Sequence, residues 1–286
     1  MTDIRKIKKI LTAEPVMEGA GVHLKRGFGH AEAPEFDPFL LFDDFRSDVP
    51  EHYLKGFPWH PHRGIETITY VLEGDVEHGD SLGNKGVIGS GDVQWMTAGS
   101  GIIHQEMPKG SDDGKMYGFQ LWANLPAKDK MIDPRYRGLT CDQIPEVRLP
   151  GGIVMKIIAG IVAGTKGPLE DIVIDPVYID VDVPGKSEFC HETKKGHTVF
   201  IYVFSGEGDF TGDAQHNSMA GNGSVILFED GDLVKVGTGD SRVRFLLVSG
   251  KPIGEPVAWQ GPIVMNTREE LTIAFEEYNN GTFIKN

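Results

Sequence analysis

Short stretches of alternating apolar and polar residues run through most of the chain and are separated by glycines and prolines. Residues 65–72, IETITYVL, alternate in this way and stop at the turn EGD, which predicts a β-strand. Strand-like runs also occupy residues 91–99, 101–107 and 116–126. Because 37 glycines and 17 prolines punctuate these runs, the pattern favours an all-β sandwich or barrel over a helical protein.

The second half of the chain repeats the pattern of the first. Residues 197–209, HTVFIYVFSGEGD, resemble residues 65–80, IETITYVLEGDVEHGD. A strand-turn-strand pattern used twice indicates an internal duplication, and hence two similar β-domains. The polar, proline-containing stretch 127–150 reads as the connection, so we predict one domain over residues 1–130 and another over residues 131–286.

The end of the chain follows a helical pattern instead. Within residues 266–281, Thr267 is a suitable N-cap and Glu270 follows three residues later, which is the signature of a capping box. Apolar residues then recur at helical spacing, at Leu271, Ala274, Phe275 and Tyr278. We predict a C-terminal helix that packs on a sheet.

The charge and composition of the chain argue against some classes of binding partner. The formal net charge of −14 repels phosphate backbones and anionic lipid, so we expect no direct binding to nucleic acid or membranes. The longest weakly polar stretch, residues 151–164, is too short to cross a bilayer, which needs about 20 apolar residues. Two distant cysteines make no disulfide framework, and no secretory segment follows Met1. We expect a cytoplasmic protein; if the source is a eukaryote, a nuclear location is also compatible with the sequence.

Two histidine pairs are the strongest chemical signal. In FPWHPHRG, His60 and His62 are two residues apart, so on a strand they share a face, and Pro61 stiffens their spacing. In GIIHQEM, His104 and Glu106 share a face in the same way. If both strands lie in one sheet, three imidazoles and a carboxylate converge, a set suited to Fe, Zn, Cu or Ni. At an octahedral metal this set leaves two positions open, which is typical of a reactive site.

These residues resemble the cupin superfamily. Its first motif has HxH, then Glu, then Gly, here His60, His62, Glu66 and Gly74, and its second motif resembles GDVQWMTAGSGIIH. The resemblance to the pirin family within the cupins is closer. It rests on several blocks in the same order: DPFLLFDDF, FPWHPHRGIETITYVLEGD, GDVQWMTAGSGIIHQEM, GFQLWANLP and EPVAWQGPIVMNTREEL.

The resemblance to pirins implies a bicupin, that is, two stacked antiparallel β-barrels of the jelly-roll type, here with a C-terminal helix. It implies one non-haem metal in the N-terminal barrel, most often iron, although Zn, Mn, Ni, Co and Cu are compatible with such ligands. The implied ligands are His60, His62, His104 and Glu106.

Two carboxylates compete for the fourth ligand position. General cupins would use Glu66 of the first motif, whereas pirin-like proteins use Glu106 of the second, and we choose Glu106. Glu66 is then expected to partner a ligand imidazole or to face the barrel lumen. Aligning the repeats carries the histidines of the first motif onto Glu192 and Lys194, so we expect no metal in the second barrel.

The resemblance implies two alternative functions. The first is a quercetin 2,3-dioxygenase-like activity on a small aromatic polyphenol, with Glu106 as ligand and as general base for the flavonol 3-hydroxyl. Side chains for the apolar wall of such a pocket are Phe57, Trp59, Trp95 and Met96. The second is a metal-dependent regulatory protein, a pirin-type coregulator that binds a transcription factor or a metabolic enzyme without turnover. A third hypothesis is that the site acts on a different small enol or polyphenol and not on flavonols, because fold and site do not fix the substrate.

Overall fold

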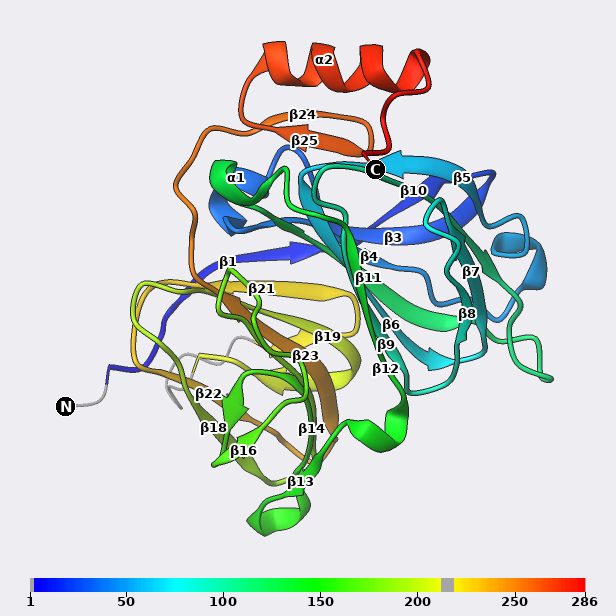
Figure 1. Cartoon of the computed structure of the whole chain (residues 1–286). Coiled ribbons are helices and arrows are strands. Elements are labelled where there is room, and N and C mark those ends of the chain that lie inside the picture. Colours follow the sequence, from blue (N-terminus) through cyan, green and yellow to red (C-terminus); the bar gives the residue numbers. More distant parts are fainter. Residues whose placement is uncertain (1–2, 212–218, 286) are drawn as a thin grey trace. The chain divides into compact units, whose positions relative to one another are not determined.

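The computed structural model describes residues 3–211 and 219–285 (Figure 1). The described residues form two compact units. Of the described residues, 14–141 and 253–285 make up the first unit, and 3–13, 142–211 and 219–252 make up the second.

The two ends of the chain therefore belong to units other than those the sequence predicts. Strand β1 (Ile7–Thr12) lies in the second unit, where it pairs antiparallel with β21 (Ser224–Phe228). Residues 253–285 lie in the first unit. The structure thus departs from a single boundary after residue 130. The cause is long-range pairing, which leaves no local signal in the sequence.

Two antiparallel sheets build the first unit. One has seven strands in the order β12-β9-β6-β11-β4-β3-β2, and the other has four in the order β5-β10-β7-β8. The seven strands are β2 (Glu14–Glu18), β3 (Val22–Phe28), β4 (Phe39–Asp44), β6 (Ile65–Glu73), β9 (Val93–Thr97), β11 (Tyr117–Asn124) and β12 (Arg135–Leu139). The four strands are β5 (Phe57–His62), β7 (Val76–Asp80), β8 (Lys85–Ile88) and β10 (Ile102–Pro108). A short helix, α1 (Ala33–Phe36), precedes β4.

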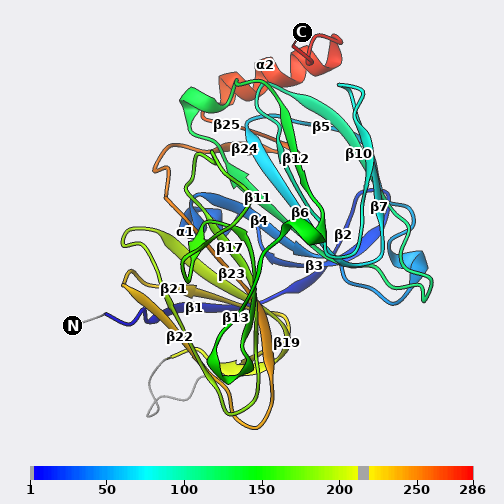
Figure 2. The ribbon, with the colours of Figure 1, turned by 60° about the horizontal axis from the view of Figure 1, so that its bottom comes forward.

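The two sheets curve into a barrel with a polar lumen. Figures 1 and 2 show β5, β10 and β7 on one side and β6, β11 and β4 on the other. The Glu106 carboxylate on β10 accepts hydrogen bonds from Thr69 on β6 (3.1 Å) and Gln120 on β11 (3.2 Å). Thr69, and Thr67 on the same face of β6, are therefore buried because they point into the barrel and not to solvent.

The C-terminal segment of the first unit is a hairpin followed by a helix. Strands β24 (Ala258–Gln260) and β25 (Ile263–Met265) precede α2 (Arg268–Asn279), and the three lie together near β5 and β10 (Figure 1). Thr267 and Glu270 form the predicted capping box. The buried side chains Leu271 and Ala274 pack with those of β25, so the predicted C-terminal helix on a sheet is confirmed.

The second unit repeats the antiparallel β-architecture. Its main sheet runs β1-β21-β19-β23-β17-β14-β13, and β18, β20 and β22 attach to it. The strands not yet given are β13 (Glu146–Arg148), β14 (Val154–Ala159), β15 (Ile161–Val162), β16 (Thr165–Lys166), β17 (Val177–Val183), β18 (Glu188–Glu192), β19 (Thr198–Asp209), β20 (Met219–Gly221), β22 (Leu233–Gly237) and β23 (Val243–Gly250). Its core is aliphatic and aromatic, with Ile157, Ile179, Ile201 and Phe245 fully buried. Short 3-10 turns η1 (Pro50–His52), η2 (Ala127–Asp129), η3 (Cys141–Gln143) and η4 (Pro150–Gly152) occupy loops of the chain.

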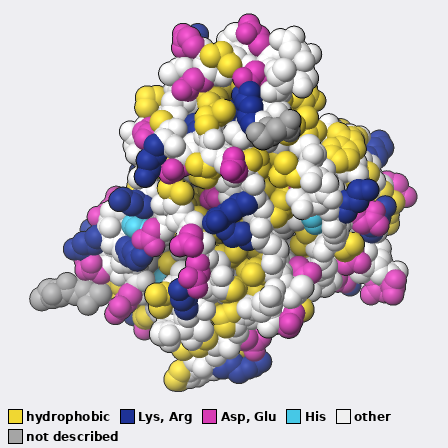
Figure 3. Space-filling model, viewed as in Figure 1, with side chains coloured by type: hydrophobic (Ala, Val, Ile, Leu, Met, Phe, Trp, Pro, Cys, Tyr) yellow, Lys and Arg dark blue, Asp and Glu magenta, His cyan; other side chains and the backbone are white. Residues whose placement is uncertain are grey.

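The described residues agree with the predicted mostly-β class. Neither α-helix found among them has the length and hydropathy to cross a bilayer. On the face drawn in Figure 3, acidic and basic side chains are interspersed, and the coloured residues form no large basic area. Both cysteines, Cys141 and Cys190, are free.

Candidate metal centre

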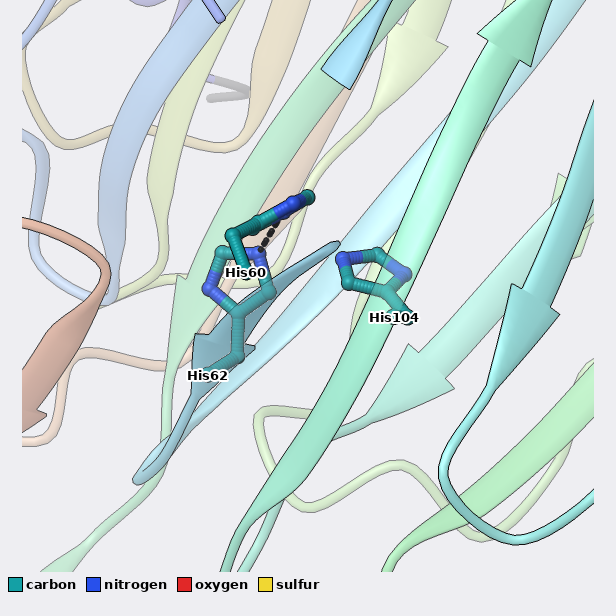
Figure 4. Close-up of side chains that lie close together, drawn as sticks. All are labelled: His60, His62 and His104. Atoms are coloured by element: carbon teal, nitrogen blue, oxygen red, sulfur yellow. Dashed lines mark hydrogen bonds between the residues drawn. The ribbon is translucent and has the colours of Figure 1, made fainter. Parts of the chain in front are cut away.

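Three histidines converge inside the barrel of the first unit. The ladder between β5 and β10 pairs His60 with His104 and His62 with Ile102, so the two predicted strands are neighbours in one sheet. One ring nitrogen of each histidine lies within 4.8 Å of the others. Figure 4 shows the three rings turned toward a common point between the strands. The predicted juxtaposition of the three imidazoles is thus present in the fold.

Backbone carbonyls decide which nitrogens of two rings carry protons. The Nδ1 of His60 lies 2.8 Å from the Pro58 carbonyl oxygen, and the Nδ1 of His62 lies 3.0 Å from that of Pro262. A carbonyl only accepts, so each Nδ1 donates, and in a neutral ring Nε2 then holds a lone pair. The two Nε2 atoms nevertheless face each other at 3.0 Å. Two lone pairs at this distance repel, and a shared cation would relieve that repulsion.

The spacing of these atoms also fits a metal ion. Metal–imidazole bonds are about 2.1 Å long, and two such bonds at a right angle place the nitrogens about 3.0 Å apart. Neither ring nitrogen of the buried His104 has a hydrogen-bond partner among the described residues. Burial, and then the neighbouring histidines, lower the pKa of His62 and of His104 well below its usual value. Neutral, unpartnered imidazoles are the form that binds metals.

Glu106 lies beside this histidine cluster but is not part of it. Among the described residues, the cluster that could hold a metal ion consists of His60, His62 and His104 alone. The buried Glu106 carboxylate instead accepts hydrogen bonds from the Thr69 hydroxyl and the Gln120 amide. His78 lies opposite Glu106 in the ladder with β7. The assignment of Glu106 as the fourth ligand therefore stays a prediction.

Glu66 does not reach the histidines. Its carboxylate accepts a 2.6 Å hydrogen bond from Thr97 and lies 3.6 Å from the Arg137 guanidinium. Thr69 lies three positions after Glu66 on β6, an odd offset, so the two side chains point to opposite faces of the strand. Because Thr69 faces the lumen, the expectation that Glu66 faces the lumen or supports a ligand imidazole is wrong.

A cavity of about 650 Å³ opens beside the cluster, and His60, His62, Glu106 and Gln120 line it. Its aromatic lining comes from Phe57, Trp59, Trp122 and Trp259. Glu18, Arg26 and Asp43 form a charged wall, in which Arg26 binds Asp43 through two 2.8 Å hydrogen bonds. A cavity of this size can bury a drug-sized ligand.

Two of the four side chains predicted to form the apolar wall of the pocket do line the cavity. Phe57 and Trp59 line the cavity, whereas Trp95 and Met96 are fully buried and are not among its lining residues. Trp122 and Trp259 take their place. The Trp122 ring stands edge-on to His62, with ring centres 5.0 Å apart, and the Trp259 ring centre lies 6.0 Å from that of Trp122.

The second unit offers different residues at the corresponding place. Its ladder pairs β18 with β22, with Phe189 opposite Val236 and His191 opposite Val234. The predicted equivalents, Glu192 and Lys194, are exposed. Residues 63–64 link β5 to β6, whereas residues 193–197 link β18 to β19, and this odd difference in length reverses which side chains face inward.

Several contacts to the site carry no strong sequence signal. Pro262 and Trp259 come from a hairpin about 200 residues after His62, and nothing local marks them. Gln120 and Trp122 do share a strand face in GFQLW, and this alternation could have identified them.

Comparison with known proteins places the chain in a family. The model of the family "Pirin" matches residues 21–123, and that of "Pirin C-terminal cupin domain" matches residues 178–284. A pirin-like protein of Caulobacter vibrioides is 44% identical over 284 residues, which cover 98% of this chain and 99% of that protein. The chain belongs to the pirin family. Its architecture is therefore that of a bicupin, with two cupin domains and a C-terminal helix, as predicted.

Other pirin relatives include human and bacterial proteins. Human pirin is 36% identical over 282 residues, covering 98% of this chain and 94% of the human protein. A solved structure titled quercetin 2,3-dioxygenase, from Acinetobacter baumannii, superposes with a TM-score of 0.89 at 29% identity and covers 98% of both chains. This pirin therefore shares its fold along its length with a protein that bears a dioxygenase name.

Proposed function

We propose that this pirin is a mononuclear, non-haem metal-dependent dioxygenase that acts on flavonols. The supporting observation is the arrangement of His60, His62 and His104, whose ring nitrogens converge beside a cavity lined by aromatic rings. His62 and His104 are buried, and neither ring nitrogen of His104 has a described hydrogen-bond partner. The three histidines would hold the metal, with iron the first choice. When bound, the metal supplies a Lewis acid that lowers the pKa of a substrate hydroxyl and a centre for reaction with O2.

In this proposal, other side chains around the cavity bind the substrate and accept its proton. Trp122 and Trp259 present ring faces and edges to a planar aromatic substrate. The Glu106 carboxylate opens onto the same cavity and is the candidate acceptor for the proton of the flavonol 3-hydroxyl. The hydrogen bonds from Thr69 and Gln120 hold that carboxylate in place as an acceptor. The substrate name carried by the Acinetobacter relative supports the choice of flavonol.

The direct test is oxygen uptake by Fe(II)-loaded protein mixed with quercetin. We expect uptake together with loss of the flavonol absorbance, and a fall of about 10²-fold or more in the Glu106→Gln variant. Glu66→Gln is the matched control, since this second buried carboxylate lies on the opposite face of β6, and it should retain activity. If no uptake occurs with metal confirmed bound, the proposal fails, and the regulatory protein that binds a partner without turnover becomes the better reading.

A further inference from the structure

The C-terminal segment, residues 258–284, contacts the strand that carries His60 and His62. The carbonyl of Pro262, in the turn between β24 and β25, is the acceptor that fixes the proton of His62 on Nδ1. Directly after His62, the Arg63 carbonyl accepts a 3.1 Å hydrogen bond from the Val264 amide. The segment therefore determines which nitrogen of His62 faces the cluster, as a carbonyl partner does for a metal-bound histidine.

A buried ammonium joins the two pieces of chain. The Lys130 Nζ donates to the Gly64 carbonyl at 2.9 Å and to the Val264 carbonyl at 3.2 Å, and its third contact is Asn124 Oδ1 at 2.6 Å. Lys130 is 1% exposed, and Gly64 lies two residues after His62. One side chain thus links the end of the histidine strand to β25.

Arg63 makes a second link further along the segment. Its guanidinium donates to the Phe283 carbonyl at 2.9 Å, lies 2.7 Å from the Glu277 carboxylate and stacks over the Phe283 ring at 4.2 Å. Its Nε donates to the Ser100 carbonyl at 2.6 Å, before β10 begins. Arg63 is therefore held by groups on both the barrel and the C-terminal segment.

From these contacts we infer that metal binding and docking of the C-terminal segment are coupled, with Lys130 as the positioning residue. The inference rests on the proposed function, because it assumes a metal on the three histidines. A docked segment presents the Pro262 carbonyl to His62 and so favours the coordinating tautomer. By thermodynamic reciprocity, a bound metal must stabilise the docked segment by the same factor. The metal state of the site would thus change the exposure of a surface segment.

The test combines metal affinity with hydrogen exchange on the full-length protein. In the wild type, saturating Co²⁺ should slow amide exchange in the peptide containing Val264 about tenfold, the lower range for partners of metal-bound histidines. Exchange in β23 of the second unit should not change. Lys130→Met should weaken Co²⁺ binding about tenfold, whereas Lys128→Met, on an exposed side chain of the same turn, should not.

Two results would overturn the coupling. One is unchanged exchange around Val264 in wild-type protein with stoichiometric Co²⁺ bound. The other is wild-type Co²⁺ affinity in Lys130→Met despite faster exchange in the segment. If Lys130→Met does not fold, the wild-type exchange measurement alone decides. A wild-type protein that binds no Co²⁺ refutes the proposed metal site itself, so the two failures remain distinguishable.

Discussion

Replacing Gly64 with alanine should destabilise the first unit and weaken metal binding at the same time. Gly64 has φ of +76°, and a Cβ added there would collide with the carbonyl oxygen of Val264 on β25. The repeat offers a matched control in Gly196, which has φ of +74° and no described atom within 4 Å of such a Cβ. The two substitutions therefore differ in the contact with the C-terminal segment and share the backbone strain.

The structure gives the size of each effect. Alanine in the left-handed region costs about 1–2 kcal/mol, and this applies to both positions. At Gly64 the Val264 carbonyl must also move away from the Lys130 ammonium, now 3.2 Å distant. A hydrogen bond to a charged group contributes about 1.5–3 kcal/mol. We therefore expect the free energy of unfolding to fall by about 1–2 kcal/mol in Gly196→Ala and by about 2.5–5 kcal/mol in Gly64→Ala.

Tryptophan fluorescence during urea unfolding reports on the first unit alone, and so on the loss of stability caused by Gly64→Ala. All four tryptophans lie in the first unit, at Trp59, Trp95, Trp122 and Trp259. Gly64→Ala should shift this transition, and Gly196→Ala should alter the far-UV circular dichroism transition instead. Co²⁺ titration of both variants should show weaker binding for Gly64→Ala alone. Equal stability losses in the two variants, or unchanged Co²⁺ affinity in Gly64→Ala, would refute the packing argument.

Three further predictions concern single side chains. His62→Ala should remove most bound metal while fluorescence and circular dichroism stay native, because the cores of both units lie elsewhere; global unfolding would mark the site as structural. Trp259→Ala should raise KM for quercetin about 2–10-fold with kcat little changed, the worth of one aromatic contact, and an unchanged KM would remove Trp259 from the substrate wall. Burial lowers the pKa of His191 from 6.5 to about 4 in the folded chain, so the unfolded chain binds more protons between these values. The contribution of His191 to the stability of the second unit should therefore fall by up to roughly 3 kcal/mol as pH drops from 6.5 to 4. His191→Phe should remove this part of the pH dependence in urea titrations followed by circular dichroism, and an unchanged slope would contradict it.

The histidine cluster could be predicted from sequence because its geometry is local to two strands. A period of two fixes which side chains share a face, so His60 with His62, and His104 with Glu106, follow once the strands are recognised. That these strands are neighbours was a hypothesis, and the ladder pairing His60 with His104 confirms it. The capping box of α2 is similarly local, and it was predicted correctly at Thr267.

Two kinds of feature could not be predicted in this way. One is which of the two faces of a strand turns inward, and the other is a contact between residues far apart in the chain. The cupin motif places Glu66 on β6 but does not say which face of that strand turns toward the barrel lumen. The motif therefore suggested a lumen-facing Glu66, which the fold does not have. In the second unit, a few extra loop residues reversed the face expected for Glu192. The pairing of Arg63 with Phe283 spans 220 residues, and the charges and apolar groups involved resemble ordinary surface and core residues.

The metal centre itself is tested most directly by anomalous diffraction from crystals of the protein grown with Fe(II) or Co(II). The account predicts one strong peak per chain, about 2.1 Å from His60 Nε2 and His62 Nε2 and within bonding distance of a ring nitrogen of His104. The same map would show whether the Glu106 carboxylate turns from Thr69 to the ion. A protein that binds metal in solution but shows the peak at Glu66, or anywhere away from the three histidines, would contradict the account.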